Sequence, residues 1–502
     1  MQFSRRSFLE AAFGASMLVC GTDVFAAPVA EPAVETAPHQ PYRGELPNIV
    51  FIFPDQVRVQ AMGYMGEEPV HTPNLDALEK ESLNLTEAVS NYPMCVPYRT
   101  IMMTGKYPLA NGVLINCFRD GVQMPESHVW WPEILKKNGY CTAYLGKWHI
   151  SLPDKTYEGK KIRGAWFSPK RRHGFDWMHC HYGPKHMTPY YCDSGWPCDR
   201  VHRPGRWSAE YEADRAIEYI VNADGKRRDP NKPFALVIGF DPPHTPYHLH
   251  PERYNRFYKD TDVEQLCAAA KNVPARDTKY GKYYRASVLE YYGSVTGIDD
   301  QVGRILRCLK AQGLEENTLF VFTSDHGDCQ GRHDWVAKNN PFEESMRIPL
   351  LMRWPKKLKA RRDSLLISVG DMYPTLISLL GLQKDLPEGL EGTDLSQTLL
   401  TGKGPRPKAQ PYYCLEYGAK RSVATLDFGR RGIRTARYSL DITAMDQGLT
   451  EIHLYDRKQD PRQLHNLAEE QPALVRKLAE KHLRPWLEKT HDRWVKNLDL
   501  LK

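Results

Sequence analysis

The sequence lacks the signatures of several large protein classes. It has no Walker A loop, no zinc-finger spacing and no helix-turn-helix pattern, so neither nucleotide-driven motion nor nucleic-acid binding is predicted. It has no internal repeat and no apolar run long enough to span a bilayer, so no transmembrane span is expected. The net charge of +7 is therefore assigned to recognition of an anionic small group or an acidic glycan.

A regular cysteine framework is also missing, although the chain has eleven cysteines. Their spacing is irregular, so disulfide pairing cannot be deduced and stays open. The cluster of His179, Cys180, His181, His186 and Cys192, continued by Cys198 and His202, raises the idea of zinc, but its spacing fits no known zinc motif.

The N-terminus resembles an export signal. Ser4-Arg5-Arg6-Ser7-Phe8-Leu9 is followed by a short apolar run and by Val24-Phe25-Ala26, which is typical of a cleaved twin-arginine signal over residues 1–26. Residues 27–45, rich in Pro, Ala and Glu, read as a linker. A periplasmic or secreted protein is expected, and lipid attachment at Cys20 is disfavoured because Val19 suits a lipobox poorly.

Four apolar runs of strand length each lead directly into polar or charged residues. The runs are 48–53, 141–145, 234–240 and 318–323, and they are followed respectively by Asp55-Gln56, Lys147 and His149, Asp241 and His244, and Asp325-His326. Ligands bind at the carboxyl ends of strands in an open α/β sheet, so these side chains converge if the strands are parallel neighbours. Helical patterns lie between the runs.

The alternation predicts an α/β fold with a large mixed, mostly parallel sheet and helices on both faces. A domain over residues 46–395 would contain it. Residues 405–502 differ in composition and pattern from the preceding part of the chain. They contain Pro-rich segments, strand-like runs near 432–443 and 451–455, and a predicted helix over about 471–489. This region is predicted to be a smaller α+β subdomain with a short antiparallel sheet.

Two long motifs resemble type I sulfatases of the alkaline phosphatase superfamily. The first is Cys95-Val-Pro97-Tyr-Arg99, and the second is Gly139-Tyr-Cys-Thr-Ala-Tyr-Leu-Gly146-Lys147-Trp-His149. They occur in the order expected for that family, and similar elements continue to about Trp494. The resemblance implies an alkaline-phosphatase-like fold, a bacterial exported glycan sulfatase, and conversion of Cys95 to formylglycine by a maturase.

The resemblance also implies a chemistry for that residue. The hydrated aldehyde is a diol: one hydroxyl attacks sulfur and forms a covalent sulfo-enzyme, and the other then ejects sulfate as the aldehyde reforms. Cys95 is expected at a helix start, where amide groups favour the anionic sulfate.

By matched motif positions, Asp55, Gln56, Asp325 and His326 would hold one divalent cation. The family and the oxygen donors favour Ca²⁺, but Gln56 and His326 replace an Asp and an Asn of the commonest pattern, which leaves Mn²⁺ or Zn²⁺ open. The cation would act as a Lewis acid on sulfate.

The remaining matched positions are assigned to charge and proton handling. Arg99 and Lys147 would position the aldehyde hydrate and neutralise sulfate, and His149 would accept a proton during sulfate release. His244 and Lys338 would face the ester oxygen and supply or stabilise its proton.

Residues 160–206 read as a substrate-facing insertion. The segment combines many aromatics with ten basic residues: Lys160, Lys161, Arg163, Lys170, Arg171, Arg172, Lys185, Arg200, Arg203 and Arg206. Such a surface could grip a sulfated sugar chain, and a solvated basic loop is the alternative reading.

The predicted function is sulfuric ester hydrolysis on a sulfated carbohydrate, with the export machinery and the maturase as partners. Two alternatives stay open. One is a phosphonate or phosphate ester hydrolase of the same superfamily, and the other is a glycan-binding protein in which Cys95 remains a thiol.

Overall fold

The computed structural model describes residues 42, 44–116, 127–183, 186–414 and 426–501. The export signal and nearly all of the linker lie outside these ranges, as does Lys185 of the basic segment. None of the helices in the described ranges combines the length and the apolar character of a membrane-crossing segment.

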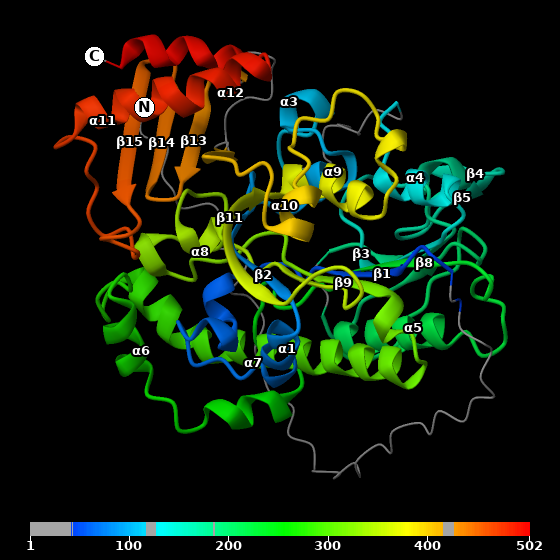
Figure 1. Cartoon of the computed structure of the whole chain (residues 1–502). Coiled ribbons are helices and arrows are strands. Elements are labelled where there is room, and N and C mark those ends of the chain that lie inside the picture. The colour runs from blue at the N-terminus through cyan, green and yellow to red at the C-terminus, as the bar shows by residue number, and fades with distance from the viewer. Residues whose placement is uncertain (1–41, 43, 117–126, 184–185, 415–425, 502) are drawn as a thin grey trace. The chain divides into compact units, whose positions relative to one another are not determined.

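A nine-stranded sheet forms the centre of the fold, with the order β11-β2-β10-β9-β1-β8-β3-β6-β7 (Figure 1). All neighbours pair in parallel except at β10 and β7, which run against the rest. The strands are β1 (Asn48–Ile52), β2 (Leu83–Val89), β3 (Cys141–Lys147), β6 (Trp177–His181), β7 (Cys192–Asp193), β8 (Phe234–Gly239), β9 (Thr318–Phe322), β10 (Leu351–Arg353) and β11 (Arg361–Ser368). The prediction of a large, mostly parallel mixed sheet is confirmed.

The four apolar runs are the four central strands. β9, β1, β8 and β3 are consecutive neighbours, and β1 pairs in parallel with both β8 and β9. Every residue of β1, β8 and β9 is buried, which explains why these strands are apolar throughout rather than alternating.

Helices cover both faces of this sheet (Figure 1). On one face α1, α5 and α7 bury their apolar stripes, and on the other α2, α4, α9 and α10 do so. The helices are α1 (Pro73–Lys80), α2 (Cys95–Thr104), α3 (Pro108–Asn111), α4 (Trp131–Lys137), α5 (Ser208–Val221), α6 (Val263–Ala270), α7 (Lys279–Ala311), α8 (Glu343–Met346), α9 (Val369–Leu379) and α10 (Ser396–Thr401).

The C-terminal region forms a separate four-stranded antiparallel sheet of β12 (Ala409–Cys414), β13 (Gly429–Thr435), β14 (Tyr438–Met445) and β15 (Gly448–Asp456). Its apolar face packs against the C-terminal helices. The run expected near 432–443 is a hairpin of two strands, and β12 arises from the end of the Pro-rich segment.

The final helix is not continuous. α11 (Pro472–Leu478) and α12 (Arg484–Lys489) are joined by a π-helical turn at Ala479–Leu483. Pro485 has no N–H to donate and its ring would clash with the carbonyl four residues earlier, which accounts for the wider turn before it.

The basic segment contributes directly to the large sheet. β6 pairs in parallel with β3, and β7 pairs with β6 at the sheet edge. A small hairpin of β4 (Thr156–Tyr157) and β5 (Lys160–Lys161) begins the segment. Residues 160–206 are therefore partly sheet and partly surface loop.

Candidate active site

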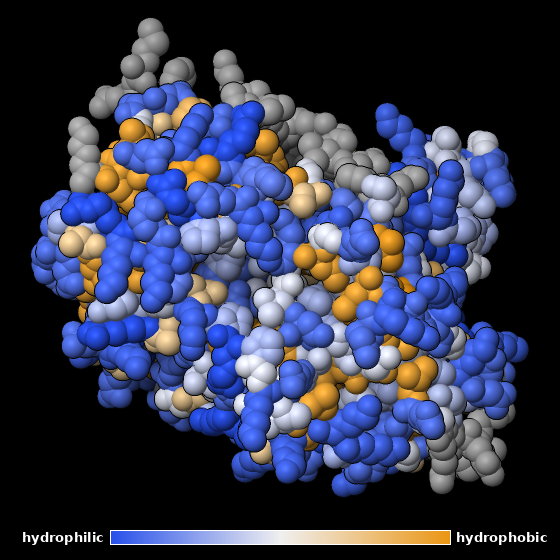
Figure 2. Space-filling view, turned by 45° about the horizontal axis from the view of Figure 1, so that its top comes forward, coloured by the Kyte–Doolittle hydropathy of each residue, from blue (hydrophilic) through white to orange (hydrophobic). Residues whose placement is uncertain are grey.

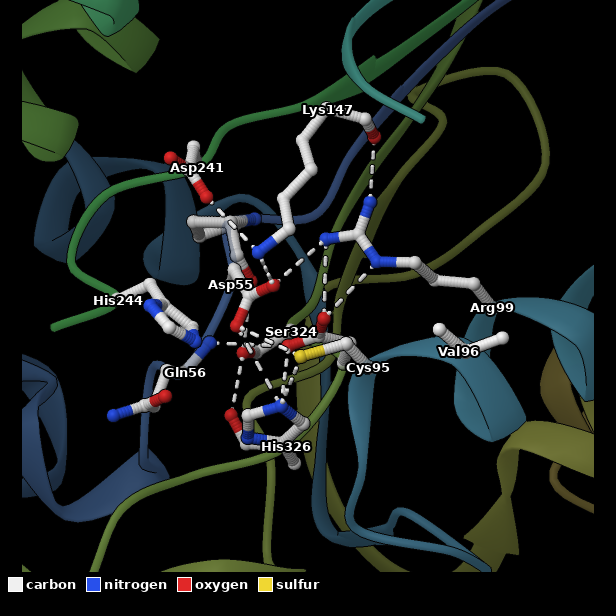
Figure 3. Close-up of polar contacts among 12 residues, drawn as sticks. Asp55, Gln56, Cys95, Val96, Arg99, Lys147, Asp241, His244, Ser324 and His326 are labelled. Atoms are coloured by element: carbon white, nitrogen blue, oxygen red, sulfur yellow. Dashed lines mark hydrogen bonds and ion pairs between the residues drawn. The ribbon is translucent and has the colours of Figure 1, made fainter. Parts of the chain in front are cut away.

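The carboxyl ends of the four central strands carry the predicted site residues to one place. Asp55 and Gln56 follow β1, Asp325 and His326 follow β9, Lys147 ends β3, and Asp241 and His244 follow β8. The structure thus brings these side chains together from segments far apart in the chain (Figure 3). The convergence expected from parallel neighbours is what the sheet order produces.

Cys95 is the first residue of α2 and is completely buried. Its Sγ lies 3.5 Å from Asp55 Oδ1 and 3.2 Å from His326 Nε2. Burial, and then the charge of Asp55, raises the pKa of the Cys95 thiol to about 12. An unmodified thiol here stays protonated at neutral pH and is a poor nucleophile.

Arg99 follows Cys95 by about one turn of α2 and bridges two carboxylates. Its Nη2 donates to Asp55 Oδ2 at 3.2 Å and to Asp325 Oδ2 at 3.1 Å, and its Nη1 donates to the carbonyl of Lys147 at 2.6 Å. All of these side chains are fully buried. The guanidinium therefore fixes the ends of α2, β1, β9 and β3 relative to one another.

Lys147 lies between two carboxylates, with Nζ 2.6 Å from Asp55 Oδ2 and 2.9 Å from Asp241 Oδ1. Burial alone would lower the pKa of Lys147, but Asp241 and Asp55 outweigh it and raise that pKa above its ordinary value. The lysine is therefore a permanent cation. Asp241 directly follows its apolar run in the sequence, but no role was predicted for it.

The two aspartates use their oxygens differently. Both Oδ2 atoms face Arg99, whereas both Oδ1 atoms face His326, whose Nε2 lies 3.5 Å from Asp55 Oδ1 and 3.6 Å from Asp325 Oδ1. Figure 3 shows Lys147 and Arg99 approaching Asp55 from the side opposite His326.

This arrangement is suited to a cation. Ligand atoms of Asp55, Cys95, Asp325 and His326 all lie within 4.8 Å of one another. His326 Nδ1 lies 2.9 Å from the carbonyl of Gly327, so Nδ1 carries the proton and Nε2 keeps its lone pair for a metal. Burial, and then Asp55, raises the pKa of Asp325, which indicates that two buried carboxylates side by side favour a bound cation.

Gln56 has protein partners at both ends of its amide. Its Nε2 donates to Asp328 Oδ2 at 2.5 Å and its Oε1 accepts from Lys338 Nζ at 2.7 Å. Asp328 is buried and also accepts from the hydroxyl of Tyr247. Sequence analysis missed Asp328 and Tyr247, although Asp328 lies in the same Ser-Asp-His-Gly-Asp string as Asp325.

Lys338 and His244 form a pair, with Nζ and Nε2 2.9 Å apart. His244 Nδ1 lies 2.8 Å from the carbonyl of Thr245, so the proton is on Nδ1 and Nε2 accepts from the ammonium. Burial, and then Lys338 and Lys147, holds the pKa of His244 well below its usual value. The imidazole is therefore neutral.

His149 follows Lys147 by two residues and has a left-handed backbone, with φ 46°. Burial, and then the charges of Lys147 and Arg99, lowers the pKa of His149 well below its usual value. It is consequently a neutral base close to the two cations.

The histidines and cysteines of the basic segment do not form a metal centre. His179 Nδ1 lies 2.9 Å from Asp193, and His181 Nε2 lies 3.0 Å from Glu212. Both imidazole rings are therefore hydrogen-bonded to buried carboxylates of the protein. In the described residues, the Asp55 group is the one cluster with the geometry of a metal site.

Comparison with known proteins gives consistent matches. Residues 47–382 match the sulfatase family profile, and residues 331–489 match the C-terminal region of N-sulphoglucosamine sulphohydrolase. The endo-4-O-sulfatase of Bacteroides thetaiotaomicron is 36% identical, with 85% of this chain and 88% of the relative covered. The ulvan-active sulfatase of Formosa agariphila is 33% identical, with 84% and 77% covered.

Solved structures agree. A Bacteroides fragilis protein described as the sulfatase yidJ has a TM-score of 0.83 and 40% identity, over 91% of this chain and 98% of that one. A phosphonate monoester hydrolase of Agrobacterium radiobacter shares the fold, with a TM-score of 0.66 over 88% of this chain and 96% of that one and 22% identity. With the family match covering every strand that carries the site, the chain belongs to the sulfatase family and is a sulfatase enzyme.

Proposed function

We propose that this sulfatase hydrolyses sulfate esters of sulfated sugars, using formylglycine made from Cys95. The observation that carries the proposal is the position of Cys95, buried at the start of α2 against Asp55 and His326. The hydrated aldehyde supplies two hydroxyls on one carbon, one to attack sulfur and one to release sulfate. A thiol with a pKa of about 12 does neither.

Asp55, Asp325 and His326 would hold the divalent cation. Their donor set of two carboxylate oxygens and one imidazole nitrogen suits Ca²⁺ less strictly than an all-oxygen set would, so Mn²⁺ or Zn²⁺ is also compatible. When bound, the cation supplies Lewis-acid stabilisation of negative charge. We keep Gln56 as a further candidate ligand through its amide oxygen, which already accepts a hydrogen bond from Lys338.

The cationic residues would neutralise the sulfate. Arg99 and Lys147 are buried and fixed by carboxylates, so they need no reorganisation when an anion arrives. Neutral His149 would take up the proton of the hydroxyl that ejects sulfate, because its depressed pKa leaves it unprotonated at neutral pH.

His244 and Lys338 would act on the leaving group. The ammonium of Lys338 already donates to His244, so it can pass a hydrogen bond or a proton to the ester oxygen as negative charge develops there. Both residues are only half-buried, which leaves room for the alcohol part of the substrate.

A sugar substrate is supported by the relatives, two of whose names give a carbohydrate, ulvan and N-acetylglucosamine. The relatives include endo-4-O-, ulvan-active and N-acetylglucosamine-6-O-sulfatases. The exposed basic residues of 160–206 add charge complementarity, and Arg200 lies 4.5 Å above the ring of Trp196. Export and maturation by a partner enzyme are further parts of the proposal, carried by the N-terminal and Cys95 motifs.

The test is release of inorganic sulfate from defined 4-O- and 6-O-sulfated amino sugars, as mono- and disaccharides. The protein is co-expressed with a formylglycine-generating enzyme, and conversion of Cys95 is verified by peptide mass spectrometry. We expect sulfate release from at least one sugar.

Two results would contradict the proposal, and each would identify a different function. Faster hydrolysis of the phosphate or phosphonate ester of one aryl alcohol than of its sulfate would identify a phosphorus ester hydrolase. Sugar binding without sulfate release, by protein in which Cys95 remains a thiol after confirmed co-expression with the maturase, would identify a glycan-binding protein.

A further inference from the structure

The predicted site residues differ in their exposure to solvent. Seven of the ten predicted site residues are buried, and the three that are half-buried are His149, His244 and Lys338. The face of the molecule drawn in Figure 2 is largely hydrophilic, with hydrophobic residues in small groups. The sulfate group must therefore lie inward and the alcohol part of the substrate outward, past Lys338 and His244.

Trp335 lies on the same loop as the half-buried Lys338, three residues before it. It is 37% exposed, and it is the one tryptophan of the eleven in the exposed class, all of which lie in the described residues. Its indole N–H donates to the carbonyl of Lys338 at 3.2 Å. The ring is thus fixed to the backbone of Lys338. The side chain of the same lysine reaches His244 and is proposed to face the ester oxygen.

The segment that carries Trp335 is held in place by the core. The N–H of Gly331 donates to the carbonyl of Trp335 at 2.8 Å, and the N–H of Trp335 donates to the carbonyl of Arg332 at 3.0 Å. Arg332 is buried and pairs with Glu68 at 3.1 Å. A Cβ on Gly331 would lie 2.6 Å from the carbonyl of Tyr280, so this turn packs directly against α7.

The same segment is conformationally strained. Left-handed backbone occurs at Gln330, His333, Asp334, Ala337 and Asn339, none of them glycine. Such residues each cost about 1–3 kcal/mol and persist only where surrounding contacts impose them. Asn339 donates its N–H to the carbonyl of Pro93, which ties the segment to the chain just before Cys95.

An exposed indole held rigidly beside Lys338 has a specific use. The C–H face of a pyranose ring is flat and weakly apolar, and it stacks on an aromatic ring that keeps a polar edge for hydrogen bonding. Because the ring is already fixed, little side-chain entropy is lost on binding.

We propose that Trp335 is the platform on which the sugar ring of the substrate stacks, so that a pyranoside sulfate, rather than a short alkyl sulfate, is the substrate class. The inference rests on the proposed function and extends it to a specificity-determining residue. Lys338 and Trp335 then contact the same leaving group, one at its ester oxygen and one at its ring face.

The test compares Trp335→Ala and Trp335→Phe with the wild type, using the sugar of the panel that the wild type hydrolyses fastest. Trp335→Ala should raise KM about tenfold, with kcat within about twofold, because the stacking surface is lost while the backbone hydrogen bonds of Gly331, Trp335 and Asn339 still hold the loop that carries Lys338. Trp335→Phe should keep most of the affinity. The Ki of inorganic sulfate, which occupies only the inner part of the site, should not change.

The matched control is Phe257→Ala. Phe257 is 40% exposed but stacks on His71, with ring centroids 4.1 Å apart, so KM should stay at the wild-type value. A binding measurement independent of turnover uses Cys95→Ala protein: sugar titration should change its tryptophan fluorescence, and the added Trp335→Phe exchange should remove that change.

The outcomes separate the two proposals. Wild-type KM in Trp335→Ala would overturn the platform, and so would a parallel rise of KM and of the sulfate Ki, which would mean that Trp335 only supports the Lys338 segment. Absence of sulfate release from every sugar by the wild type would overturn the proposed function and the platform with it.

Discussion

The inner and outer halves of the site are built differently. The inner half, around Cys95, Asp55 and Asp325, is completely buried: Cys95 begins α2, and the two aspartates lie three residues past the ends of β1 and β9. The outer half, around His244 and Lys338, is half-exposed and sits on loops, one of which is rich in left-handed residues. The proposed nucleophile and cation ligands are thus held by buried segments next to the central strands, whereas the residues proposed to contact the leaving group lie on more exposed loops.

The largest effect should come from the inner half. Cys95→Ala should lower turnover by at least about 10⁴-fold, because no other side chain supplies the nucleophile. Its melting temperature should stay near that of the wild type. Cys308→Ala, on α7 and remote from the site, is the control and should retain full activity; near-native rates in Cys95→Ala would contradict the nucleophile assignment.

Asp325→Asn should come next, with a loss of about 10³-fold in kcat/KM. One of the two buried carboxylates that face His326 is neutralised, so metal content measured by elemental analysis should fall in parallel. Asp446→Asn, on an exposed turn, should change neither quantity. Full metal content in Asp325→Asn would rule out the ligand role.

In the outer half, Lys338→Ala should lower kcat about 10²-fold on a sugar sulfate but much less on an aryl sulfate. An aryl alcohol leaves without proton assistance, whereas a sugar alcohol needs it. Metal content should remain that of the wild type, which separates the two halves. Equal losses on both substrates would show that Lys338 is not a leaving-group residue.

A substitution of Asp241 tests whether this carboxylate supports Lys147 or the bound cation. Asp241→Asn removes one of the two carboxylates on Lys147 and should lower kcat/KM about tenfold while metal content is kept. Asp241→Glu should recover part of the loss by restoring the charge. If the asparagine variant loses its metal instead, Asp241 supports the cation and not Lys147.

The smallest effect on catalysis should come from Glu68. It pairs with Arg58 and with Arg332, which lies at the start of the loop that carries Trp335 and Lys338. Burial alone would raise the pKa of Glu68, but Arg332 and Arg58 lower it to about 2. The ion pairs therefore stabilise the fold fully above about pH 4.5, and this stabilisation is lost as the pH falls toward 2.

Glu68→Gln should accordingly lower the free energy of unfolding by about 3 kcal/mol at pH 7. Denaturant unfolding at pH 7 and at lower pH should show the deficit shrinking as the pH falls below 4.5. A deficit that is independent of pH would mean that the charge of Glu68 is not what stabilises the segment.

Much of the inner half could be predicted from sequence because its information is local. Apolar runs such as 48–53 and 318–323 mark central parallel strands, and polar residues directly after them must meet at one sheet edge. The helix start at Cys95 followed from the adjacent Pro97 and the apolar residues after it.

The rest depended on contacts between distant segments. The pairing of Lys147 with Asp241 and of Gln56 with Asp328 follows from tertiary packing, which residue spacing does not reveal. β6 was missed because its sequence, Trp-Met-His-Cys-His, is not an apolar run like those of the four central strands, although all five residues are buried. Its histidines find carboxylates on neighbouring elements, and no periodicity rule anticipates that.

For the proposed conversion of Cys95, its complete burial sets an order of events in biosynthesis. In the folded chain the side chain lies against Asp55 and His326 and is out of reach of a modifying enzyme. A chain that folded first would keep its thiol for good, and adding the maturase afterwards would not rescue it. Yield of active protein should thus depend on how early the two proteins meet, rather than on how long they are incubated together.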